Sequence, residues 1–199
     1  MKLILASKNQ HKLLELDAIL RQLGMEVALE SEYGIDLDVE ESGTTFEQNS
    51  YLKAKAVFDA TGCAAIADDS GLMVDALHGE PGVYSARYGG RQTDAARTAL
   101  LLENMKDIPD DQRGAQFVSV ITCIFPDGRK ITAKGVCRGT ILHETHGTGG
   151  FGYDPVFYVP ACGMTFAELP GEQKNKISHR GLALREFSRK VQEGIYDEE

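Results

Sequence analysis

The sequence predicts an α/β fold, in which buried strands alternate with helices that cover a sheet. Short apolar runs typical of buried strands recur along the chain, first at residues 3–6 and again at residues 63–67. Between them, leucine repeats at helical spacing as far as Gly24, and a second helical segment ends at Gly62. This succession indicates an open α/β sheet, a fold that binds ligands beyond the carboxyl ends of its strands.

The composition is that of an ordinary globular protein, and it limits the possible partners. A chain of 199 residues is long enough for one well-buried domain with a lobe, so we expect a single domain over residues 1–199. The formal net charge of −9 disfavours an electrostatic grip on DNA or RNA. The four cysteines show no paired spacing, the first apolar run is too short for a signal peptide, and no run approaches the roughly 20 residues of a membrane span. We therefore expect a reduced, cytoplasmic protein that contacts neither nucleic acid polymers nor membranes.

The polar loop after the first apolar run predicts an anion site. Ser7 or Asn9 can cap the following helix, whose first-turn N–H groups favour a negatively charged group. Lys8 and Lys12 add positive charge beside these N–H groups, so a phosphate would fit there. The alternative is an ordinary helix cap beside surface lysines. The loop is not a Walker A motif, because it lacks the glycines and the Gly-Lys-Ser/Thr ending.

An acidic pair, Asp68 and Asp69, follows the apolar run 63–67 directly. We expect the strand to end at this pair and the chain to turn at Ser70 and Gly71. Two carboxylates at the end of a strand suit a hard cation such as Mg²⁺ or a general base. The alternative is a solvated turn in which an aspartate caps the next segment.

The helix before the acidic pair begins with residues 44–47, which match the Thr-x-x-Glu capping box. Asn49 and Lys53 share one face of this helix. The simplest interpretation is that this polar face of the helix is exposed to solvent. If the face looks toward the acidic pair instead, Lys53 would neutralise a phosphate or keep a carboxylate ionised, and the preceding loop would supply Glu40 or Glu41 as a further cation ligand.

The middle of the chain is mainly scaffold. The glycine-rich and proline-rich loop at residues 79–90 forms either a site rim or interface, or a packed surface loop. Thr93 caps a helix, and the β-branched segments 116–125 and 130–137 form a hairpin whose first strand is central in the sheet.

A second unusual segment, residues 147–155, places four glycines around Phe151 and Tyr153. Glycines let a backbone approach a ligand closely, and an aromatic ring among them can stack on a flat base. A glycine-rich turn with a core aromatic is the alternative. His143 and His146 precede this segment without further ligands at a recognisable spacing, so no metal site is expected there.

The last helix is expected to begin at Ser178, a natural cap, and to bury Leu182, Leu184 and the apolar residues that follow at helical spacing. His179 and Arg180 then lie in its first turn. An arginine at this end opposes the helix dipole, which is a mild sign of function.

Five segments together resemble one protein family. They are Ser7-x-Asn9-x-x-Lys12; Glu40-Glu41-Ser42-Gly43 with Phe46, Glu47, Asn49 and Lys53; residues 67–72; residues 150–155; and Lys174 with Ser178, His179 and Arg180. With these motifs in order from residue 2 to about 191, the chain is similar to the inosine/xanthosine triphosphate pyrophosphatases, which clear noncanonical purine nucleotides. The resemblance implies an elongated α/β fold of two lobes around a long mixed β-sheet flanked by helices, with a nucleotide in the cleft. It also implies a Mg²⁺ requirement, a monophosphate and pyrophosphate as products, and a homodimer.

The resemblance also implies roles for individual residues. The first loop, Ser7, Lys8, Asn9, Gln10, His11 and Lys12, would bind the triphosphate together with Lys53. Glu40, Asp68 and Asp69 would hold Mg²⁺, and Asp69 would accept the proton of the attacking water; the sequence leaves open whether Glu40 or Glu41 is the ligand. Ser70, Phe151, Gly152, Tyr153, Asp154, Lys174, His179 and Arg180 would hold the nucleotide and read its base. The family commonly has Thr-Gly-Asn or Thr-His-Asn where this chain has Ser7, Lys8 and Asn9. The extra lysine is a departure from the family pattern that is expected to alter phosphate affinity and removes no essential donor.

Two other functions stay open at this point. A related pyrophosphatase that acts on modified pyrimidine nucleotides would share the scaffold. A non-catalytic nucleotide-binding protein would bind ITP without releasing pyrophosphate and would not need Asp69.

Overall fold

The fold is built on a mixed β-sheet. The computed structural model describes residues 1–198, and within them seven strands lie in the order β2-β1-β3-β4-β5-β6-β7. Their bounds are β1 Lys2–Leu5, β2 Glu26–Leu29, β3 Ala65–Val74, β4 Gly114–Ile124, β5 Lys130–Ile141, β6 Phe157–Val159 and β7 Met164–Thr165. β1 pairs in parallel with β2 and β3, whereas β6 pairs antiparallel with β5 and β7. The predicted α/β class with a mixed sheet is confirmed.

Helices flank this sheet, and the chain divides into two compact units. The α-helices are α1 Gln10–Leu20, α2 Phe46–Thr61, α3 Asp94–Asn104, α4 Gly171–Ile177 and α5 His179–Glu193. The 3₁₀ helices are η1 Arg21–Leu23, η2 Glu30–Tyr33, η3 Asp75–Leu77, η4 Gly82–Gly90, η5 Asp110–Gln112 and η6 Asp154–Val156. The first unit contains Met1–Asp69, Ser119–Gly135 and His179–Glu199, and the second contains Ser70–Val118 and Val136–Ser178.

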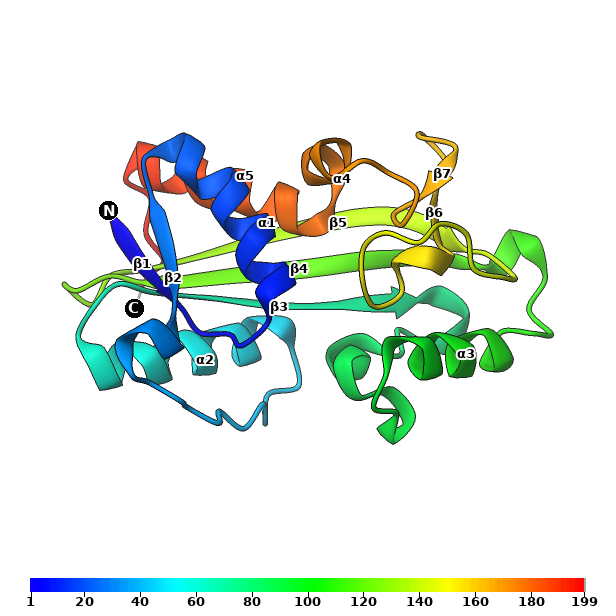
Figure 1. Ribbon diagram of the computed structural model, residues 1–199, viewed down its shortest axis with the longest axis horizontal. Helices are drawn as coiled ribbons and strands as arrows, with labels where there is room; N and C mark the ends of the chain where they lie inside the picture. The colour runs from blue at the N-terminus through cyan, green and yellow to red at the C-terminus, as the bar shows by residue number, and fades with distance from the viewer. Residues whose placement is uncertain (199) are drawn as a thin grey trace. The chain divides into compact units, whose positions relative to one another are not determined.

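In the first unit, β1 is buried on both faces. Leu3 and Leu5 pack in one core with residues of α1 and α5, whereas Ile4 packs in another core with residues of α2. Figure 1 shows α1 and α5 on one face of these strands and α2 on the other. An apolar run without alternation is therefore what the position of β1 requires.

β3 continues this two-sided packing. Ile66 joins the core with α1 and α5, whereas Ala65 and Ala67 join the core with α2. Because successive side chains of a strand point to opposite faces, Asp68 is directed toward α1 and α5, and Asp69 toward α2. The acidic pair is therefore divided between the two faces of the sheet.

α2 is capped one residue later than predicted. The hydroxyl of Thr45 accepts a hydrogen bond from the backbone N–H of Gln48 at 3.2 Å. The side-chain oxygen of Gln48 accepts in turn from the backbone N–H of Thr44 at 2.7 Å. Gln48 therefore takes the place expected for Glu47, but its side chain accepts from Thr44, the residue before the cap, and not from the cap Thr45 itself as in a capping box.

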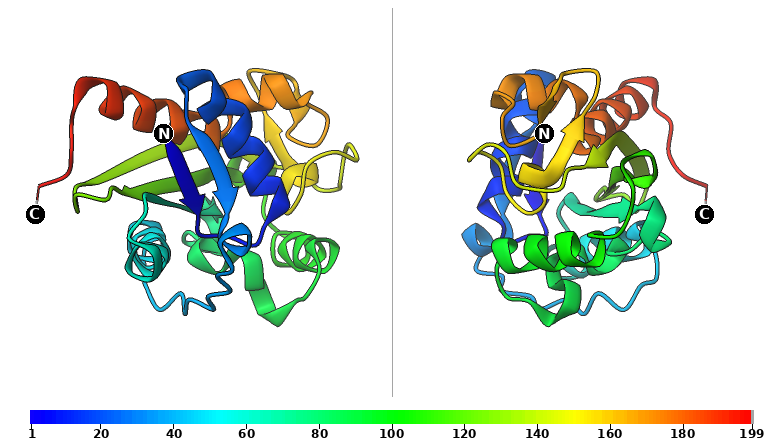
Figure 2. Two further views of the ribbon diagram at one scale, coloured as in Figure 1. Left: turned by 60° about the vertical axis from the view of Figure 1, so that its left-hand side comes forward. Right: turned by 90° about the vertical axis from the view of Figure 1, so that its right-hand side faces the viewer.

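In the second unit, an aromatic cluster holds the strands together. The ring of Phe117 lies 4.7 Å from that of Phe157 and 5.7 Å from that of Phe166, measured between centroids. Figures 1 and 2 show α3 on one face of the strands of this unit and α4 on the other. Arg113 is 2% exposed, and its guanidinium donates to the carbonyl oxygens of Met105 and Ile141, both at 2.7 Å. This arginine ties the end of α3 to the end of β5.

Several predicted elements are confirmed, and others are wrong. The hairpin of β4 and β5 is present, and β4 lies between β3 and β5 as expected for a central strand. The predicted end of a strand at Asp68 is wrong, because β3 runs on through Ser70 and Gly71 to Val74. Leu182 was expected to be buried and is 37% exposed. Ser178 ends α4, a helix that the sequence did not predict, and α5 begins at the next residue.

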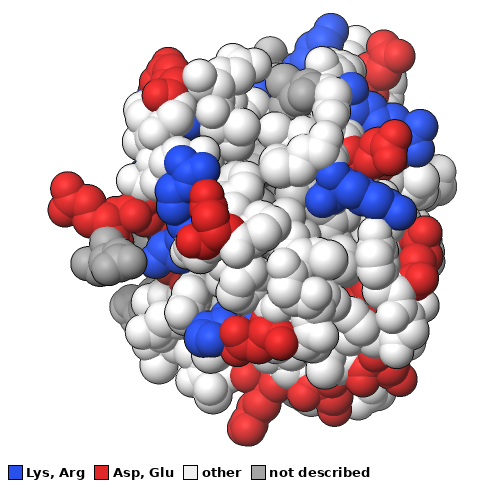
Figure 3. Space-filling view, turned by 90° about the vertical axis from the view of Figure 1, so that its left-hand side faces the viewer, with Lys and Arg blue, Asp and Glu red and all other residues white. Residues whose placement is uncertain are grey.

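Charged side chains of both signs lie on the surface of the protein in small scattered groups. Over the face drawn in Figure 3, Lys and Arg side chains are interspersed with Asp and Glu. Within residues 1–198, none of the helices is both long and hydrophobic enough to cross a lipid bilayer.

Candidate active site

The candidate site of the first unit begins where β1 stops beside β3. The last paired residue of β1 is Leu5, opposite Ile66, and the N–H of Ala6 still donates to the carbonyl of Ile66 at 2.9 Å. Alternate carbonyls of a strand point to the same edge, so the next carbonyl on this edge of β3 belongs to Asp68. Two lysines satisfy it, since the amines of Lys12 and Lys53 donate to this oxygen at 3.1 and 3.2 Å. The end of β1 thus gathers two cations on one backbone oxygen.

The carboxylate of Asp68 is enclosed by three donors. One oxygen accepts from the hydroxyl of Ser119 at 2.6 Å, and the other lies 2.9 Å from the amine of Lys12 and 2.9 Å from the guanidinium of Arg180. Its side chain is fully buried. Burial by itself would raise the pKa of Asp68, but Arg180, Lys12 and Ser119 together hold that pKa well below its ordinary value. Asp68 is therefore a fixed anion.

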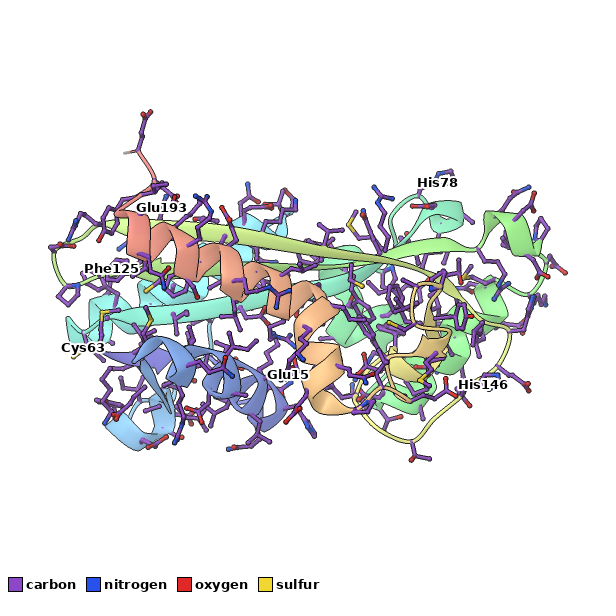
Figure 4. The ribbon with its side chains drawn as sticks, turned by 90° about the horizontal axis from the view of Figure 1, so that it is seen from above. Glu15, Cys63, His78, Phe125, His146 and Glu193 are labelled. Atoms are coloured by element: carbon purple, nitrogen blue, oxygen red, sulfur yellow. The ribbon has the colours of Figure 1, made fainter. Side chains whose placement is uncertain are left out.

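Arg180 is the largest of the fully buried side chains. Besides Asp68, its guanidinium contacts the carboxylate of Glu15, which Figure 4 labels on α1. Burial would lower the pKa of Arg180, but the two carboxylates raise it above its ordinary value. The unusual arginine in the first turn of α5 is thus explained by two acidic partners from α1 and β3.

Asp69 lies in a different environment on the opposite face. One oxygen accepts from the amine of Lys53 at 2.7 Å, and the same amine lies 2.9 Å from the carboxylate of Glu41. The other oxygen, Oδ2, is buried and has no hydrogen-bond partner among residues 1–198. Burial raises the pKa of Asp69 above its ordinary value, although Lys53 acts to lower it. A buried carboxylate oxygen without a partner is costly unless something binds to it, which makes Asp69 a candidate for a functional role.

The first loop is ordered around Asn9. The side-chain oxygen of Asn9 accepts from the backbone N–H groups of His11 at 2.9 Å and Lys12 at 3.3 Å, and so caps α1. Of the predicted phosphate ligands, Lys12 points inward to Asp68, whereas Lys8 is exposed and pairs with Asp36 at 2.5 Å. Ser7 is half-buried, and Gln10 and His11 are exposed at the start of the helix. The two lysines of this loop are therefore not equivalent.

The predicted metal ligands are not gathered in one place. Among residues 1–198, no three His, Cys, Asp or Glu side chains are grouped so that they could hold a metal ion. Glu40 is exposed, whereas Glu41 is half-buried and reaches the amine that also binds Asp69. Asp68 is already occupied by three donors. Asp69 Oδ2 does fit a cation, because carboxylate oxygens are the donors that Mg²⁺ prefers.

In the second unit, the glycine-rich segment is folded around Asp154. One oxygen of this buried carboxylate accepts from the backbone N–H of Phe151 at 2.9 Å and from the amine of Lys174 at 2.8 Å. That amine also lies 5.0 Å from the centroid of the Phe151 ring. A positive φ of 70° at Gly150 allows the tight turn, since a Cβ there would lie 2.1 Å from the carboxylate of Asp154. An ion pair and an aromatic ring are thereby held together.

The remaining predicted ligands differ in exposure. Tyr153 is 3% exposed, and its hydroxyl donates to the carbonyl of Ser85 at 2.9 Å, so it is a core aromatic. Phe151 and Ser70 are half-buried. His179 is 5% exposed at the start of α5, and its carbonyl lies so close to Gly135 that a Cβ there would approach it to 2.1 Å.

Comparison with known proteins identifies the family of this chain. The Ham1 family model matches residues 3–190 of the chain. The chain belongs to the Ham1 family. A relative from Desulforamulus reducens, named dITP/XTP pyrophosphatase, is 51% identical over 186 residues, which cover 93% of this chain and 92% of the relative.

Solved Ham1 structures share the fold. The Ham1 protein of Staphylococcus aureus is 42% identical, with a TM-score of 0.87 over 98% of this chain and 100% of that chain. A HAM1 protein from Coxiella burnetii is 41% identical, with a TM-score of 0.88 over 97% of this chain and 99% of that chain. The family resemblance that the motifs indicated is confirmed.

Sequence reasoning missed two partners of this Ham1 site. Glu15 binds Arg180, and Ser119 binds Asp68. Glu15 follows Lys12 by three positions, which places both on one face of α1, so helical spacing contained a signal for it. Ser119 is one polar residue within an apolar strand, and only the pairing of strands distant in sequence identifies its partner.

Proposed function

We propose that this protein hydrolyses noncanonical purine nucleoside triphosphates, such as ITP, dITP and XTP, to the monophosphate and pyrophosphate. The observation that carries the proposal is Asp69 Oδ2, a buried oxygen without a hydrogen-bond partner on a carboxyl group whose pKa is raised. A group of this kind can take a proton from water at physiological pH. The relative named dITP/XTP pyrophosphatase supports the choice of substrate.

We assign binding of the phosphates to the first unit. Lys12 and Lys53 place two amines on the carbonyl of Asp68, and the N-terminus of α1, which Asn9 caps, adds the positive end of its helix dipole. A triphosphate carries about four negative charges, which amines and a helix N-terminus stabilise. Asp68 and Glu15 hold Arg180 in a fixed direction beside these amines. Lys8, paired with Asp36 at the surface, adds a cation that a long polyphosphate can reach by exchanging partners.

Asp69 is the proposed acceptor of the proton that the attacking water releases. The water oxygen forms a bond to the α-phosphorus, the bond from this phosphorus to the bridging oxygen breaks, and pyrophosphate leaves with the electron pair. The proton of the water passes to Asp69 Oδ2, while Lys53 stays on Oδ1 and fixes the plane of the carboxylate. A positioned base of this kind contributes about 10²–10⁴-fold to the rate.

Asp69 is also the best-suited ligand for Mg²⁺ in the first unit. Glu41 supplies a second carboxylate on the same amine, and Glu40 is the exposed neighbour that the family resemblance favours. Asp68 would have to give up one of its three donors to join them. When bound, Mg²⁺ supplies charge neutralisation on the phosphates and polarises a phosphoryl oxygen.

We assign binding of the purine ring to the second unit. Phe151 offers a ring for stacking, and the ion pair of Lys174 and Asp154 offers a donor and an acceptor beside it. A 6-oxo purine presents an acceptor where adenine presents an amino group. A donor aimed at this position would gain a partner from a 6-oxo purine and none from adenine, which is a strong discriminator.

A panel of nucleotides tests the proposal. Pyrophosphate release would be measured from ITP, dITP, XTP, ATP and a modified pyrimidine triphosphate, each with Mg²⁺ and with EDTA. The expected result is rapid release from the first three only, and only with Mg²⁺. Efficient hydrolysis of ATP, equal rates in EDTA, or binding of ITP without release would contradict it.

We further propose that the protein works as a homodimer in the cytoplasm. Sedimentation velocity across a concentration range tests the first point, and fractionation of cells that express the full chain tests the second. A monomer at all concentrations, or recovery with the membranes, would contradict them.

A further inference from the structure

The first turns of α3 hold one residue of the glycine-rich segment by both of its backbone groups. The carboxylate of Asp94, the first residue of α3, accepts from the N–H of Gly152 at 2.7 Å. One turn later, the hydroxyl of Thr98 donates to the carbonyl of Gly152 at 3.3 Å. Thr98 is 4% exposed, and Arg97 contacts the second oxygen of Asp94, so both contacts come from oriented side chains.

Gly152 is the residue after Phe151, and its backbone is intrinsically free. It has a φ of 62°, and a Cβ at this position would meet no atom of the described residues within 4 Å. Gly150, on the other side of Phe151, also has a positive φ. With glycine on both sides, the direction of the Phe151 ring depends on hydrogen bonds to the backbone rather than on packing of adjacent side chains.

The segment also has room to move. An open pocket of about 400 Å³ lies beside it, lined by Ala95, Ala99 and Leu102 of α3 and by residues 147–152. Asp154 fixes the N–H of Phe151 from one side. Asp94 and Thr98 also line this pocket, and their two contacts to Gly152 hold the segment at a fixed distance from α3.

We infer that Asp94 and Thr98 are positioning residues that fix Phe151 for binding of the purine base. This inference rests on the proposed function, because it assigns Phe151 to the base. Neither residue acts on the phosphates, which are assigned to residues of the first unit. Loss of either contact therefore weakens nucleotide binding and base selectivity without slowing the chemical step.

The test compares Asp94→Ala and Thr98→Val with wild type by steady-state kinetics on dITP and dATP. We expect KM for dITP to rise about tenfold in Asp94→Ala and about threefold in Thr98→Val, as loss of one charged and one neutral hydrogen bond gives. The kcat value stays within about twofold of wild type, and the preference for dITP over dATP falls by a similar factor to the KM change. Asp94→Asn and Thr98→Ser, which keep an acceptor and a donor, restore KM.

Hydrogen exchange gives a second measurement that does not depend on activity. The amide of Gly152 exchanges faster in Asp94→Ala than in wild type, while amides in β4 keep their protection. Glu103→Gln, a change on the exposed side of α3 where Glu103 pairs with Lys106, serves as the control and leaves both measurements unchanged.

The outcomes separate this inference from the proposed function. No pyrophosphate release by the wild type would overturn the proposed function and, with it, the assignment of Phe151. An active wild type with unchanged KM in both variants, or a loss of kcat equal to the loss in kcat/KM, would overturn only the positioning role of Asp94 and Thr98.

Discussion

Replacing Asp68 by asparagine tests the buried charge network of the first unit. The side chain of Asp68 is fully buried and accepts from Ser119, Lys12 and Arg180. The amide keeps one acceptor oxygen but loses the charge and turns an NH₂ group toward cationic donors. Breaking a buried ion pair by removing one partner costs about 3–5 kcal/mol. In the variant Arg180 keeps its contact to Glu15, and Lys12 keeps its hydrogen bond to the backbone carbonyl of residue 68. We therefore expect the free energy of unfolding to fall by an amount at the lower end of this range, about 3 kcal/mol.

Urea denaturation at pH 7 measures this loss in the free energy of unfolding. The chain has no Trp and seven Tyr, so tyrosine fluorescence and far-UV circular dichroism are suitable probes. For a chain of this size, about 3 kcal/mol corresponds to a decrease in Tm of roughly 6–12 °C. Ser119→Ala serves as the matched comparison, because it removes one neutral donor and should cost only about 1–2 kcal/mol.

The pH dependence supplies a second check with a defined sign. The folded pKa of Asp68 lies well below its ordinary value, so its contribution to stability is fully present above the pKa of the unfolded carboxyl, about 3.9. That contribution is lost as the pH falls through this value toward the folded pKa. The difference in stability between wild type and Asp68→Asn should therefore narrow only below about pH 4. A difference under about 1 kcal/mol at pH 7, or one that is the same at pH 5 and pH 3, would refute the reasoning.

Three further predictions concern Asp69 and the second unit. Asp69→Asn should lower kcat by about 10²–10⁴-fold in a pyrophosphate-release assay. Near-normal turnover would contradict the proposed role of Asp69 as the proton acceptor. Lys53 lowers and Glu41 raises the pKa of Asp69. Lys53→Met should therefore move the acid limb of the pH profile of kcat/KM to higher pH, and Glu41→Gln should move it to lower pH. Shifts of both variants in the same direction would show that a group other than Asp69 sets this limb. Tyr153→Phe should cost about 1 kcal/mol in urea denaturation by removing the bond to the Ser85 carbonyl, with kcat unchanged; a large fall in kcat would place this hydroxyl in the chemistry.

Local signals in the sequence predicted much of the scaffold. Capping residues such as Asn9 and Thr93 begin α1 and α3, and the β-branched runs around the turn at residues 126–128 form the β4–β5 hairpin. These features depend on residues that are close together in the chain, so the local sequence is enough to predict them. α4 escaped prediction because the segment Gly171–Ile177 is short and polar, and no apolar repeat marks it.

Contacts between distant segments could not be predicted. Ser119 reaches Asp68 across 51 positions, and Arg180 reaches it across 112. Polar residues inside an apolar pattern indicate that a partner exists, because buried polar groups are paired, but they do not identify it. The family resemblance grouped Arg180 with the nucleotide ligands, whereas the structure shows its guanidinium held by Glu15 and Asp68.

The largest difference between expectation and structure lies in the acidic pair, and it has a simple cause. Glycine after Ser70 suggested a turn, which would have let both carboxylates face one ligand. Because β3 continues through this glycine, alternation divides the pair, so that Asp68 forms ion pairs with Lys12 and Arg180 while Asp69 forms one with Lys53. Their pKa values consequently move in opposite directions, downward for Asp68 and upward for Asp69. Two adjacent aspartates with such different environments are suited to different tasks, a permanent anion that organises cations and a base that can accept a proton. Continuation of one strand by a few residues is therefore enough to turn a repeated residue type into two distinct functional groups.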